Sequence, residues 1–295
     1  METNLQNKSY VVTGATSGIG LATAEMLARR GANLIGIGRS EDRCRKTEAR
    51  LAALHPQASI HYFAADLSLQ SQVRAAAEKI RASLRADGIN GLDGLVNNAG
   101  TFTYWLALSA EGFETQWAVN HLAPFILTLE LLPLLQAASG RVVTVSSDSH
   151  YAGRMHWDDL QLRRAYNGLH AYENTKLANV LFTREFNRRL GGRSGVKAFA
   201  VDPGLVKTEI GFKGTPALVR WVWNLRRSGG VSPEVPAGDI VSLLGEPSIQ
   251  QSREVYWKGG KPKKSSRRAQ DDIDALRLWV VSEKMVGINQ DGQHE

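Results

Sequence analysis

The sequence contains very little cysteine, because Cys44 is the only one among 295 residues. A lone cysteine excludes a disulfide within the chain and is compatible with a reducing compartment, so we expect a cytoplasmic protein. Cys44 lies in the charged, helix-like stretch EDRCRKTEAR, which predicts a surface position for this thiol.

Long hydrophobic runs are also absent. The most apolar stretch, LAPFILTLELLPLL at 122–135, is short for a membrane span and contains two prolines and a glutamate. The N-terminal stretch METNLQNKSYVVTG passes directly from polar residues into an apolar segment, unlike a signal peptide. We therefore expect no integral membrane anchor.

Acidic residues are fewer than basic ones, 29 against 36, which gives a net charge of +7. Much of the excess lies in WKGGKPKKSSRRAQ at 257–270, where no aromatic residues alternate with the basic ones. A nucleic-acid surface would need aromatic side chains placed for stacking among its basic groups. The run is therefore expected to be a solvated loop, and no nucleic-acid partner is predicted.

Short apolar segments alternate with longer helical patterns along the chain, as expected for a parallel sheet with crossover helices. This alternation predicts an α/β fold with a doubly wound parallel sheet of about seven strands and a ligand crevice at the carboxyl ends of the strands. The expected strands cover 9–13, 33–38, 59–65, 94–98, 141–147, 196–202 and 253–257, and the expected helices cover 18–30, 41–54, 70–86, 110–137, 172–191 and 233–244.

A glycine-rich turn joins the first expected strand to the first expected helix. In VVTGATSGIGLATAEMLARRG, Gly14, Gly18 and Gly20 would let the backbone approach a pyrophosphate at the N-terminus of the helix. Such a turn alone can be merely a tight connection. Its place at the start of a β/α alternation favours a dinucleotide site.

The second expected strand ends in IGIGRS, so Gly38 stands where an acidic residue usually holds the ribose of NAD. Arg39 follows it, with Ser40 and Arg43 close behind. An arginine in this place accommodates the 2′-phosphate of NADP, although an ordinary surface arginine is the alternative. NADP(H) is therefore the expected cofactor.

Together these motifs resemble the classical short-chain dehydrogenase/reductase family. The glycine pattern matches its cofactor loop, AADLS at 64–68 its acidic turn, and VNNAG at 96–100 its adenosine pocket. The resemblance covers almost the whole chain and implies a Rossmann-type fold with helices on both faces of the sheet. It also implies that NADP(H) contacts Gly14, Thr16, Ser17, Gly18, Ile19, Gly20, Arg39, Ser40, Asp66, Leu67, Asn98, Ala99, Gly100, Tyr172, Lys176, Pro203, Gly204 and Thr208.

A tyrosine and a lysine lie four residues apart in YENTK, on one face of an expected helix. Carbonyl reduction needs a proton donor, and a nearby cation lowers the pKa of a tyrosine from its usual value of about 10. We therefore expect Tyr172 to donate the proton and Lys176 to lower its pKa. By resemblance, Lys176 also holds the nicotinamide ribose. Thr175 stands where the family more often has serine or alanine, a change expected to leave the reacting face undisturbed.

The segment RVVTVSSDSH ends at the expected crevice with two serines. The catalytic serine of the family aligns with Ser147, which would contact the substrate together with Tyr172, whereas Ser146 is expected to be structural. The long stretch between Ser147 and Tyr172 resembles the retinol-dehydrogenase-like branch. That branch often has histidine where this chain has Asp202, a departure that would affect substrate preference.

Asn120 matches the asparagine that holds a relay water in the family. Pro124 has no amide hydrogen, so it leaves the carbonyl oxygen of Asn120 available to that water. A simple helix kink at Pro124 is the alternative. Three histidines, His150, His156 and His170, lie near the expected site, but their spacing matches no standard metal-ligand motif and no metal is predicted.

No proline- or glycine-rich linker divides the chain, so 1–295 is expected to be a single domain. Residues 1–204 would form mainly the cofactor-binding core, 205–232 a substrate-lid segment, and 258–295 a basic loop and C-terminal helix. The segment GFKGTPALVRWVWNLRRSGG carries a broad apolar surface suited to a bulky substrate. Peripheral membrane contact and plain packing are the alternatives for this segment.

The leading hypothesis is an NADP(H)-dependent oxidoreductase that interconverts a small-molecule carbonyl compound and its alcohol. The substrate would be hydrophobic, either retinal-like or another bulky apolar ketone or aldehyde. A ketoreductase that tailors a polyketide, steroid or other cyclic metabolite is the alternative enzyme. A non-catalytic NADPH-sensing protein is the alternative from another class, although a sensor need not keep Asn120, Ser147, Tyr172 and Lys176 together. Family members often form dimers or tetramers, so a homo-oligomer is compatible with the sequence.

Overall fold

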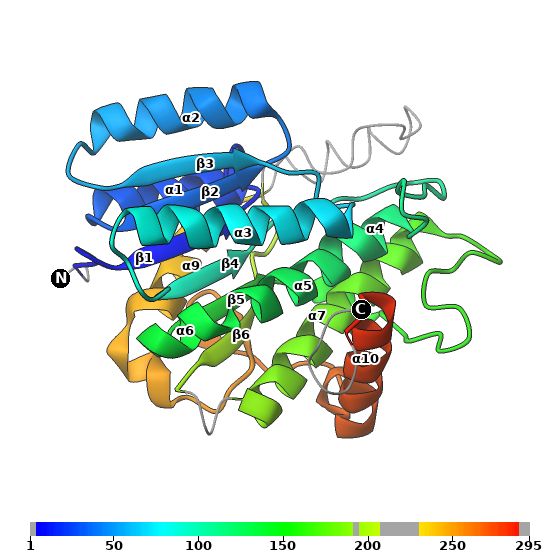
Figure 1. Cartoon of the computed structure of the whole chain (residues 1–295). Helices are drawn as coiled ribbons and strands as arrows, with labels where there is room; N and C mark the ends of the chain where they lie inside the picture. Colours follow the sequence, from blue (N-terminus) through cyan, green and yellow to red (C-terminus); the bar gives the residue numbers. More distant parts are fainter. Residues whose placement is uncertain (1–3, 191–194, 207–229, 289–295) are drawn as a thin grey trace.

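The computed structural model describes residues 4–190, 195–206 and 230–288, and its central feature is one eight-stranded sheet in the order β3-β2-β1-β4-β5-β6-β7-β8 (Figure 1). Strands β1 to β7 are parallel, as predicted, and β8 adds an antiparallel edge that the sequence did not suggest. The strands are β1 (Ser9–Thr13), β2 (Asn33–Gly38), β3 (Ile60–Ala64), β4 (Gly94–Asn97), β5 (Arg141–Val145), β6 (Lys197–Asp202), β7 (Tyr256–Lys258) and β8 (Lys261–Pro262).

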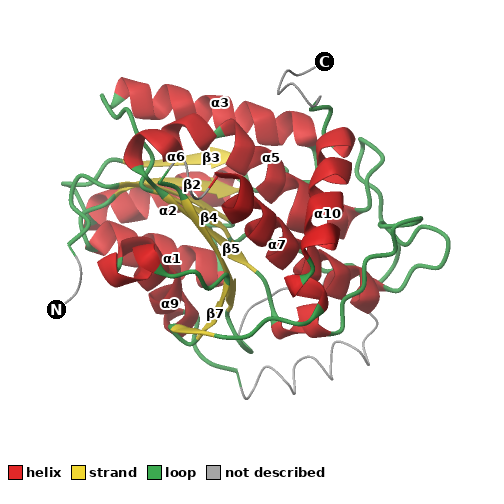
Figure 2. Ribbon diagram, turned by 90° about the horizontal axis from the view of Figure 1, so that it is seen from below, coloured by secondary structure: helices red, strands yellow, loops and turns green. Residues whose placement is uncertain are grey.

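Helices cover both faces of the sheet (Figure 2). One face is covered by α1 (Gly18–Arg29), α2 (Glu41–Leu54) and α9 (Glu234–Gly245), and the other by α3 (Gln70–Ala86), α5 (Ala123–Glu130) and α7 (Gly168–Leu190). The C-terminal helix α10 (Asp272–Met285) packs against α7 on the outside of the second layer. The strands alternate between two cores: Val11 packs under the second layer and Val12 under the first.

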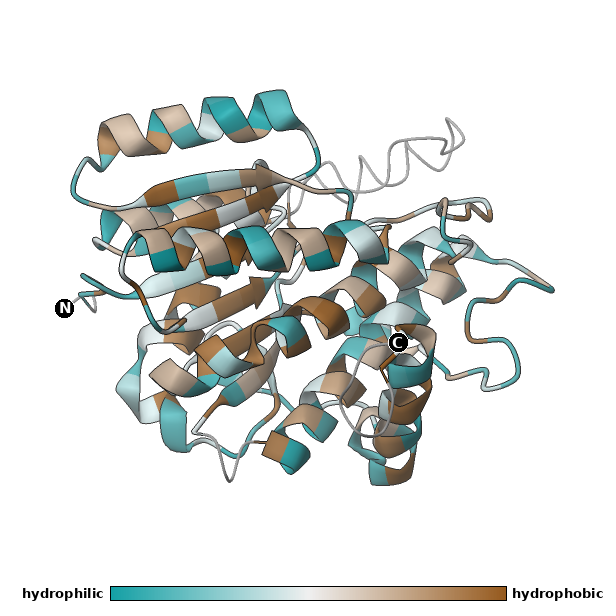
Figure 3. Ribbon diagram, viewed as in Figure 1, coloured by the Kyte–Doolittle hydropathy of each residue, from teal (hydrophilic) through white to brown (hydrophobic). Residues whose placement is uncertain are grey.

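The prediction of one continuous helix at 110–137 is wrong, because several shorter helical segments occupy this region. The first begins after Glu114, whose carboxylate accepts hydrogen bonds from the amides of Gln116 and Trp117. A three-residue helix, α4 (Thr115–Trp117), then passes into the π-helical segment Ala118–Leu122, followed by α5 and a bent α6 (Leu132–Ala138). Figure 3 shows that α5 is mostly hydrophobic, in contrast to the more hydrophilic α2.

The surface position expected for Cys44 is also wrong. Its side chain is 2% exposed, because α2 packs this thiol against the end of β2 and β3. The Sγ atom lies 3.6 Å from the carbonyl oxygen of Phe63, and burial raises the pKa of the thiol. Most charged residues of α2 are exposed, whereas the Glu48 carboxylate accepts a hydrogen bond from the amide of Tyr62 in β3 at 2.6 Å.

Two expectations fall beyond the described residues: Thr208 and most of the lid segment 205–232. Among the residues that the structure does describe, no single helix is long and apolar enough to cross a membrane. One bent pair, Thr115–Glu130 with Leu132–Ala138, meets the criteria of length and composition alone.

One buried histidine joins the π-helical segment to the C-terminal helix. His121 is 1% exposed, and its Nε2 atom lies 2.8 Å from the hydroxyl oxygen of Ser282 in α10. Burial lowers the pKa of His121 from 6.5 to about 3. The imidazole is therefore neutral in the folded protein at pH values where it would be protonated in the unfolded chain.

This histidine should make stability depend on pH. Between pH 6.5 and about 3 the unfolded state binds one more proton at this position, so the free energy of unfolding should fall with decreasing pH by up to about 1.4 kcal/mol per pH unit. Denaturant titrations of the wild type and of His121→Gln, which has no titrating group there, should converge as the pH falls. Parallel pH profiles for the two proteins would contradict this linkage.

Candidate active site

The site lies where the order of the strands reverses, between β1 and β4. At this point Thr13 makes four hydrogen bonds to residues 96–99. Its carbonyl oxygen accepts from the Asn98 carboxamide at 2.8 Å, and its hydroxyl accepts from the amides of Asn98 and Ala99 at 3.0 Å. The hydroxyl also donates to Val96 at 3.2 Å. These bonds hold the glycine-rich turn against the end of the neighbouring strand.

The glycine-rich turn leaves no room for side chains. A Cβ atom on Gly20 would lie 2.3 Å from the Gly14 carbonyl oxygen and 2.4 Å from the Asn98 Nδ2 atom. Gly14 and Gly18 have φ angles of +67° and +54°, which favour glycine. Ser17 precedes α1 without making a side-chain capping bond, so the amides at this helix end suit an anionic ligand such as a pyrophosphate.

Thr16 and Ile19, which lie beside these glycines in the sequence, differ in the exposure of their side chains. Thr16 is half-buried beside Gly38, whereas the Ile19 side chain is buried in the core beneath the turn. A ligand above the turn could therefore meet only the backbone of Ile19.

At the end of β2, Gly38 has no space for an acidic side chain. A Cβ atom there would lie 2.6 Å from the Thr16 side chain and 2.8 Å from the sulfur of Cys44. Arg39 and Ser40 are exposed beyond it, and the Ser40 hydroxyl begins α2 by accepting from the amide of Arg43. This edge of the site thus presents a cation and no carboxylate at position 38.

The turn after β3 contributes Asp66 and Leu67, both half-buried. One carboxylate oxygen of Asp66 accepts from the amide and the hydroxyl of Ser68, at 2.9 and 2.8 Å. Leu67 packs against the core under the second helical layer. The turn is therefore ordered by its own side chain and lies at the same edge of the sheet as the glycine-rich turn.

Tyr172 and Ser147 meet at the end of β5. The Ser147 side chain is near enough to affect the pKa of Tyr172, and the ring of Phe102 packs edge-on against Tyr172 with centroids 6.0 Å apart. Burial and the negative charge of Asp202 raise the pKa of Tyr172 to about 12, while the neighbouring Ser147 side chain acts to lower it. The neighbouring serine, Ser146, donates to the carbonyl oxygen of Lys176 at 2.8 Å, which agrees with its expected structural role.

Lys176 lies on the same face of α7 as Tyr172, and its expected effect on the pKa of Tyr172 stays a prediction. Its ammonium group is buried, donates to the carbonyl oxygen of Val145 at 3.0 Å, and lies 5.3 Å from the centre of the Tyr172 ring. The charge thus lies over the ring of Tyr172. Burial lowers the pKa of Lys176 itself to about 8.

Asn120 lies in the π-helical segment, a local distortion that is frequent at functional sites. Its carboxamide accepts from the amide of Thr101 at 2.7 Å and donates to the carbonyl oxygen of Thr101 at 2.9 Å and to the hydroxyl of Thr175 at 3.1 Å. Thr175 in turn donates to the carbonyl oxygen of Tyr172 at 2.8 Å. With the carboxamide engaged, the backbone of Asn120 is the part suited to holding a water.

The glycine after β4 lies within this group of residues. A Cβ atom on Gly100 would be 3.5 Å from the Asn120 Oδ1 atom and 3.8 Å from the Lys176 ammonium nitrogen. Thr175 was expected to be neutral, yet its buried hydroxyl links Asn120 to the helix turn that carries Tyr172. Alanine at this position could not make that link.

The turn after β6 contains Asp202, Pro203 and Gly204. Gly204 has a φ angle of +70°, and its amide donates to the Asp202 carboxylate at 2.9 Å. The three histidines considered as metal ligands do not assemble, since no group of three or more His, Cys, Asp or Glu side chains suited to a metal occurs within the described ranges.

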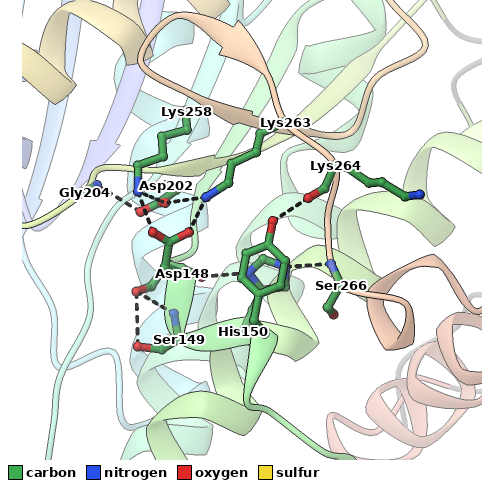
Figure 4. A network of polar contacts seen from close by, with 11 residues as sticks. Asp148, Ser149, His150, Asp202, Gly204, Lys258, Lys263, Lys264 and Ser266 are labelled. Atoms are coloured by element: carbon green, nitrogen blue, oxygen red, sulfur yellow. Dashed lines mark hydrogen bonds and ion pairs between the residues drawn. The ribbon is translucent and has the colours of Figure 1, made fainter.

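Sequence reasoning missed the charges around Asp202. Figure 4 shows Asp148 and Asp202 facing Lys258 and Lys263 from the β7–β8 hairpin. The basic run was expected to be a solvated loop, which is wrong for these two lysines because their ammonium groups form ion pairs. Their pairing with Asp148 joins residues 110 and 115 positions apart, and no local pattern in the sequence signals it.

Comparison with known proteins gives consistent matches. A family model described as short chain dehydrogenase matches residues 8–216. Retinol dehydrogenase 13 of Homo sapiens is 37% identical over 298 residues, covering 96% of this chain and 86% of that protein. Retinol dehydrogenase 12 of Mus musculus is 36% identical over 289 residues, covering 97% and 89%.

Solved structures agree with the fold. An uncharacterized protein from Mycobacterium Paratuberculosis has a TM-score of 0.71 at 32% identity, covering 96% of this chain and 95% of that one. An alcohol dehydrogenase from the archaeon Thermococcus sibiricus, complexed with 5-hydroxy-NADP, has a TM-score of 0.66 at 26% identity, covering 88% and 100%.

The link through Thr175 can be measured with two substitutions. Thr175→Ala and Thr175→Ser both lose the methyl group, but only alanine also loses the hydroxyl that bonds Asn120 and Tyr172. Thr175→Ala should therefore unfold with a free energy lower than that of Thr175→Ser by about 1 kcal/mol in denaturant titrations. Equal stabilities would show that the hydroxyl contributes nothing to the framework.

Proposed function

The chain belongs to the short-chain dehydrogenase family, in its retinol-dehydrogenase-like branch, and we propose on this premise that it reduces bulky apolar carbonyl compounds with NADPH. Membership makes it an oxidoreductase that interconverts alcohols and carbonyl compounds with a nicotinamide cofactor. The observation that carries the proposal is the placement of Ser147 and Tyr172 next to each other beside buried Lys176, at the same sheet edge as the glycine-rich turn.

The chain's own residues fit such a cofactor. The glycine-rich turn, with no space for a Cβ atom on Gly20, accommodates a pyrophosphate at the start of α1. When bound, the nicotinamide supplies the hydride for reduction. Arg39 is exposed, and Gly38 has no room for a carboxylate, so this edge suits the 2′-phosphate of NADP better than the free ribose of NAD.

Ser147 and Tyr172 would bind the substrate oxygen between them. The hydroxyl of Ser147 orients this oxygen, and the hydroxyl of Tyr172 donates the proton. A tyrosine with a pKa of about 12 is protonated at neutral pH, which suits a proton donor and therefore the direction of reduction. Lys176, whose pKa is about 8, can exchange a proton near neutrality, and a water on the backbone of Asn120 would connect it to solvent.

The described rim of the site supports an apolar substrate. Phe102 packs against Tyr172, and Trp105 and Leu106 in the same loop are 66% and 41% exposed. The start of α7 fits closely against this loop, because a Cβ atom on Gly168 would lie 2.2 Å from the carbonyl oxygen of Thr103. Exposed Leu169, at the start of α7, continues this apolar rim.

A panel of carbonyl compounds tests the proposed activity. Polyene aldehydes and cyclic ketones should be reduced, as followed by NADPH consumption, and small polar carbonyls should be poor substrates. Tyr172→Phe should retain NADPH binding but lose roughly 10²–10⁴-fold in turnover, because it lacks the proton donor. Normal turnover in Tyr172→Phe would exclude this mechanism, and exclusive reduction of small polar carbonyls would exclude the apolar substrate class.

Cofactor preference is tested separately at Arg39. Arg39→Asp should raise KM for NADPH by about tenfold or more and leave KM for NADH nearly unchanged, because it removes the cation that would pair with the 2′-phosphate. Arg253→Asp makes the same change of charge at another exposed arginine and serves as the control. An unchanged ratio of the KM values for NADPH and NADH in Arg39→Asp would refute the role of Arg39 in binding the 2′-phosphate.

A further inference from the structure

Four charged side chains surround the end of β6, and they come from distant parts of the chain (Figure 4). The Lys258 ammonium lies 2.5 Å from Asp148 and 2.8 Å from Asp202. The Lys263 ammonium lies 2.6 Å from Asp148 and 4.0 Å from Asp202. Two carboxylates thus face two ammonium groups, and their formal charges cancel.

This cluster adjoins the reacting groups. Asp148 directly follows Ser147, whose hydroxyl accepts from the amide of Ser149 and so begins the 3-10 helix Asp148–Tyr151. Asp202 is 1% exposed, and its negative charge disfavours ionisation of the Tyr172 hydroxyl. A change in the net charge of the cluster would therefore change how readily the Tyr172 hydroxyl ionises.

The buried Asp202 carboxylate requires compensation, whereas Asp148 is exposed. An ionised group removed from water is strongly destabilised unless it is paired. Hydrogen bonds with Asp202, Lys258 and Lys263 hold the pKa of Asp148 below its usual range although partial burial alone would raise it. Without Lys258, only the more distant ammonium group of Lys263 would remain to compensate Asp202.

We propose that Lys258 and Lys263 are positioning residues for proton transfer at Tyr172, which they serve by fixing Asp148 beside Ser147 and by neutralising Asp202. This role rests on the proposed function, since it assigns Tyr172 as the proton donor. It also gives the β7–β8 hairpin a part in the chemistry, although neither lysine is assigned a contact with the substrate.

The field at the Tyr172 hydroxyl has other sources, which the substitutions below leave in place. Lys176 lies on the same helix, His150 on the 3-10 helix, and Tyr256 on β7. His150 contributes no charge near neutrality, because burial lowers its pKa. Tyr256 stays protonated, because burial and both carboxylates raise its pKa. The charges that the experiment changes are therefore those of Asp202 and the two lysines.

The experiment compares Lys258→Met, Asp202→Asn and the double variant with the wild type. Carbonyl reduction is lost as pH rises through the pKa of Tyr172, so this alkaline limb of kcat/KM reports on the tyrosine. Removing the cation should move the limb to higher pH, and removing the carboxylate should move it to lower pH, each by roughly half to one unit. The double variant should return close to the wild-type limb.

Two controls separate electrostatics from a structural effect. Lys261→Met changes an exposed lysine of the same hairpin and should leave the limb in place. Ultraviolet titration of tyrosinate without cofactor, with the matching Tyr172→Phe background subtracted, should show Tyr172 ionising at lower pH in Asp202→Asn than in the wild type. If Lys258→Met does not fold, Asp202→Asn and the double variant still supply the comparison.

The possible results are distinct. The proposal is supported if the alkaline limb of kcat/KM moves in opposite directions in Lys258→Met and Asp202→Asn and returns to the wild-type position in the double variant. The proposal would be overturned if the single variants had lower turnover but an unchanged alkaline limb, or if Lys261→Met moved the limb equally. The lysines would then have a structural role. If the wild type reduces no carbonyl compound, the proposed function fails, while the tyrosinate titration still decides whether the cluster sets the ionisation of Tyr172.

Discussion

The hydrogen bonds between Thr13 and residues 96–99 are the contact on which the rest of the site depends. They join the ends of β1 and β4, the two neighbouring strands at which the strand order reverses. They also hold the glycine-rich turn close to the edge of the sheet. Because the Asn98 carboxamide occupies the space beside Gly20, no side chain can stand there. The start of α1 therefore stays open to a ligand, next to the ends of β5 and β6, which carry the polar groups.

Much of this arrangement could be predicted because it is local. An apolar run, a glycine-rich turn and an amphipathic segment together specify β1 and α1, and the spacing of Tyr172 and Lys176 places both on one face of α7. The carboxyl ends of parallel strands meet at one edge, so the position of Ser147 at the end of an apolar strand is enough to place it near them. The expected family membership was confirmed by the comparisons.

Other features depend on tertiary contacts that no periodicity reports. Cys44 is buried because Gly38 leaves a gap that its sulfur fills, and a charged helix pattern gives no hint of this. The helix expected at 110–137 is interrupted by a π-helical segment, where tertiary contacts of Asn120 and His121 prevail over local preference. The electrostatic effect of Lys176 on Tyr172 stays a prediction, because residue spacing fixes a face but not the distance from ammonium to hydroxyl.

The pairing of Asp148 with Lys258 has a consequence for how the protein is made. Translation delivers the N-terminal strands first, and domains begin to fold as they emerge. The two carboxylates at the ends of β5 and β6 leave the ribosome long before the hairpin that neutralises them, since the Asp148 bond spans 110 residues. A nascent chain that stops short of Lys258 would hold these acids without their partners, so that the charge balance of this cluster is completed late in biosynthesis.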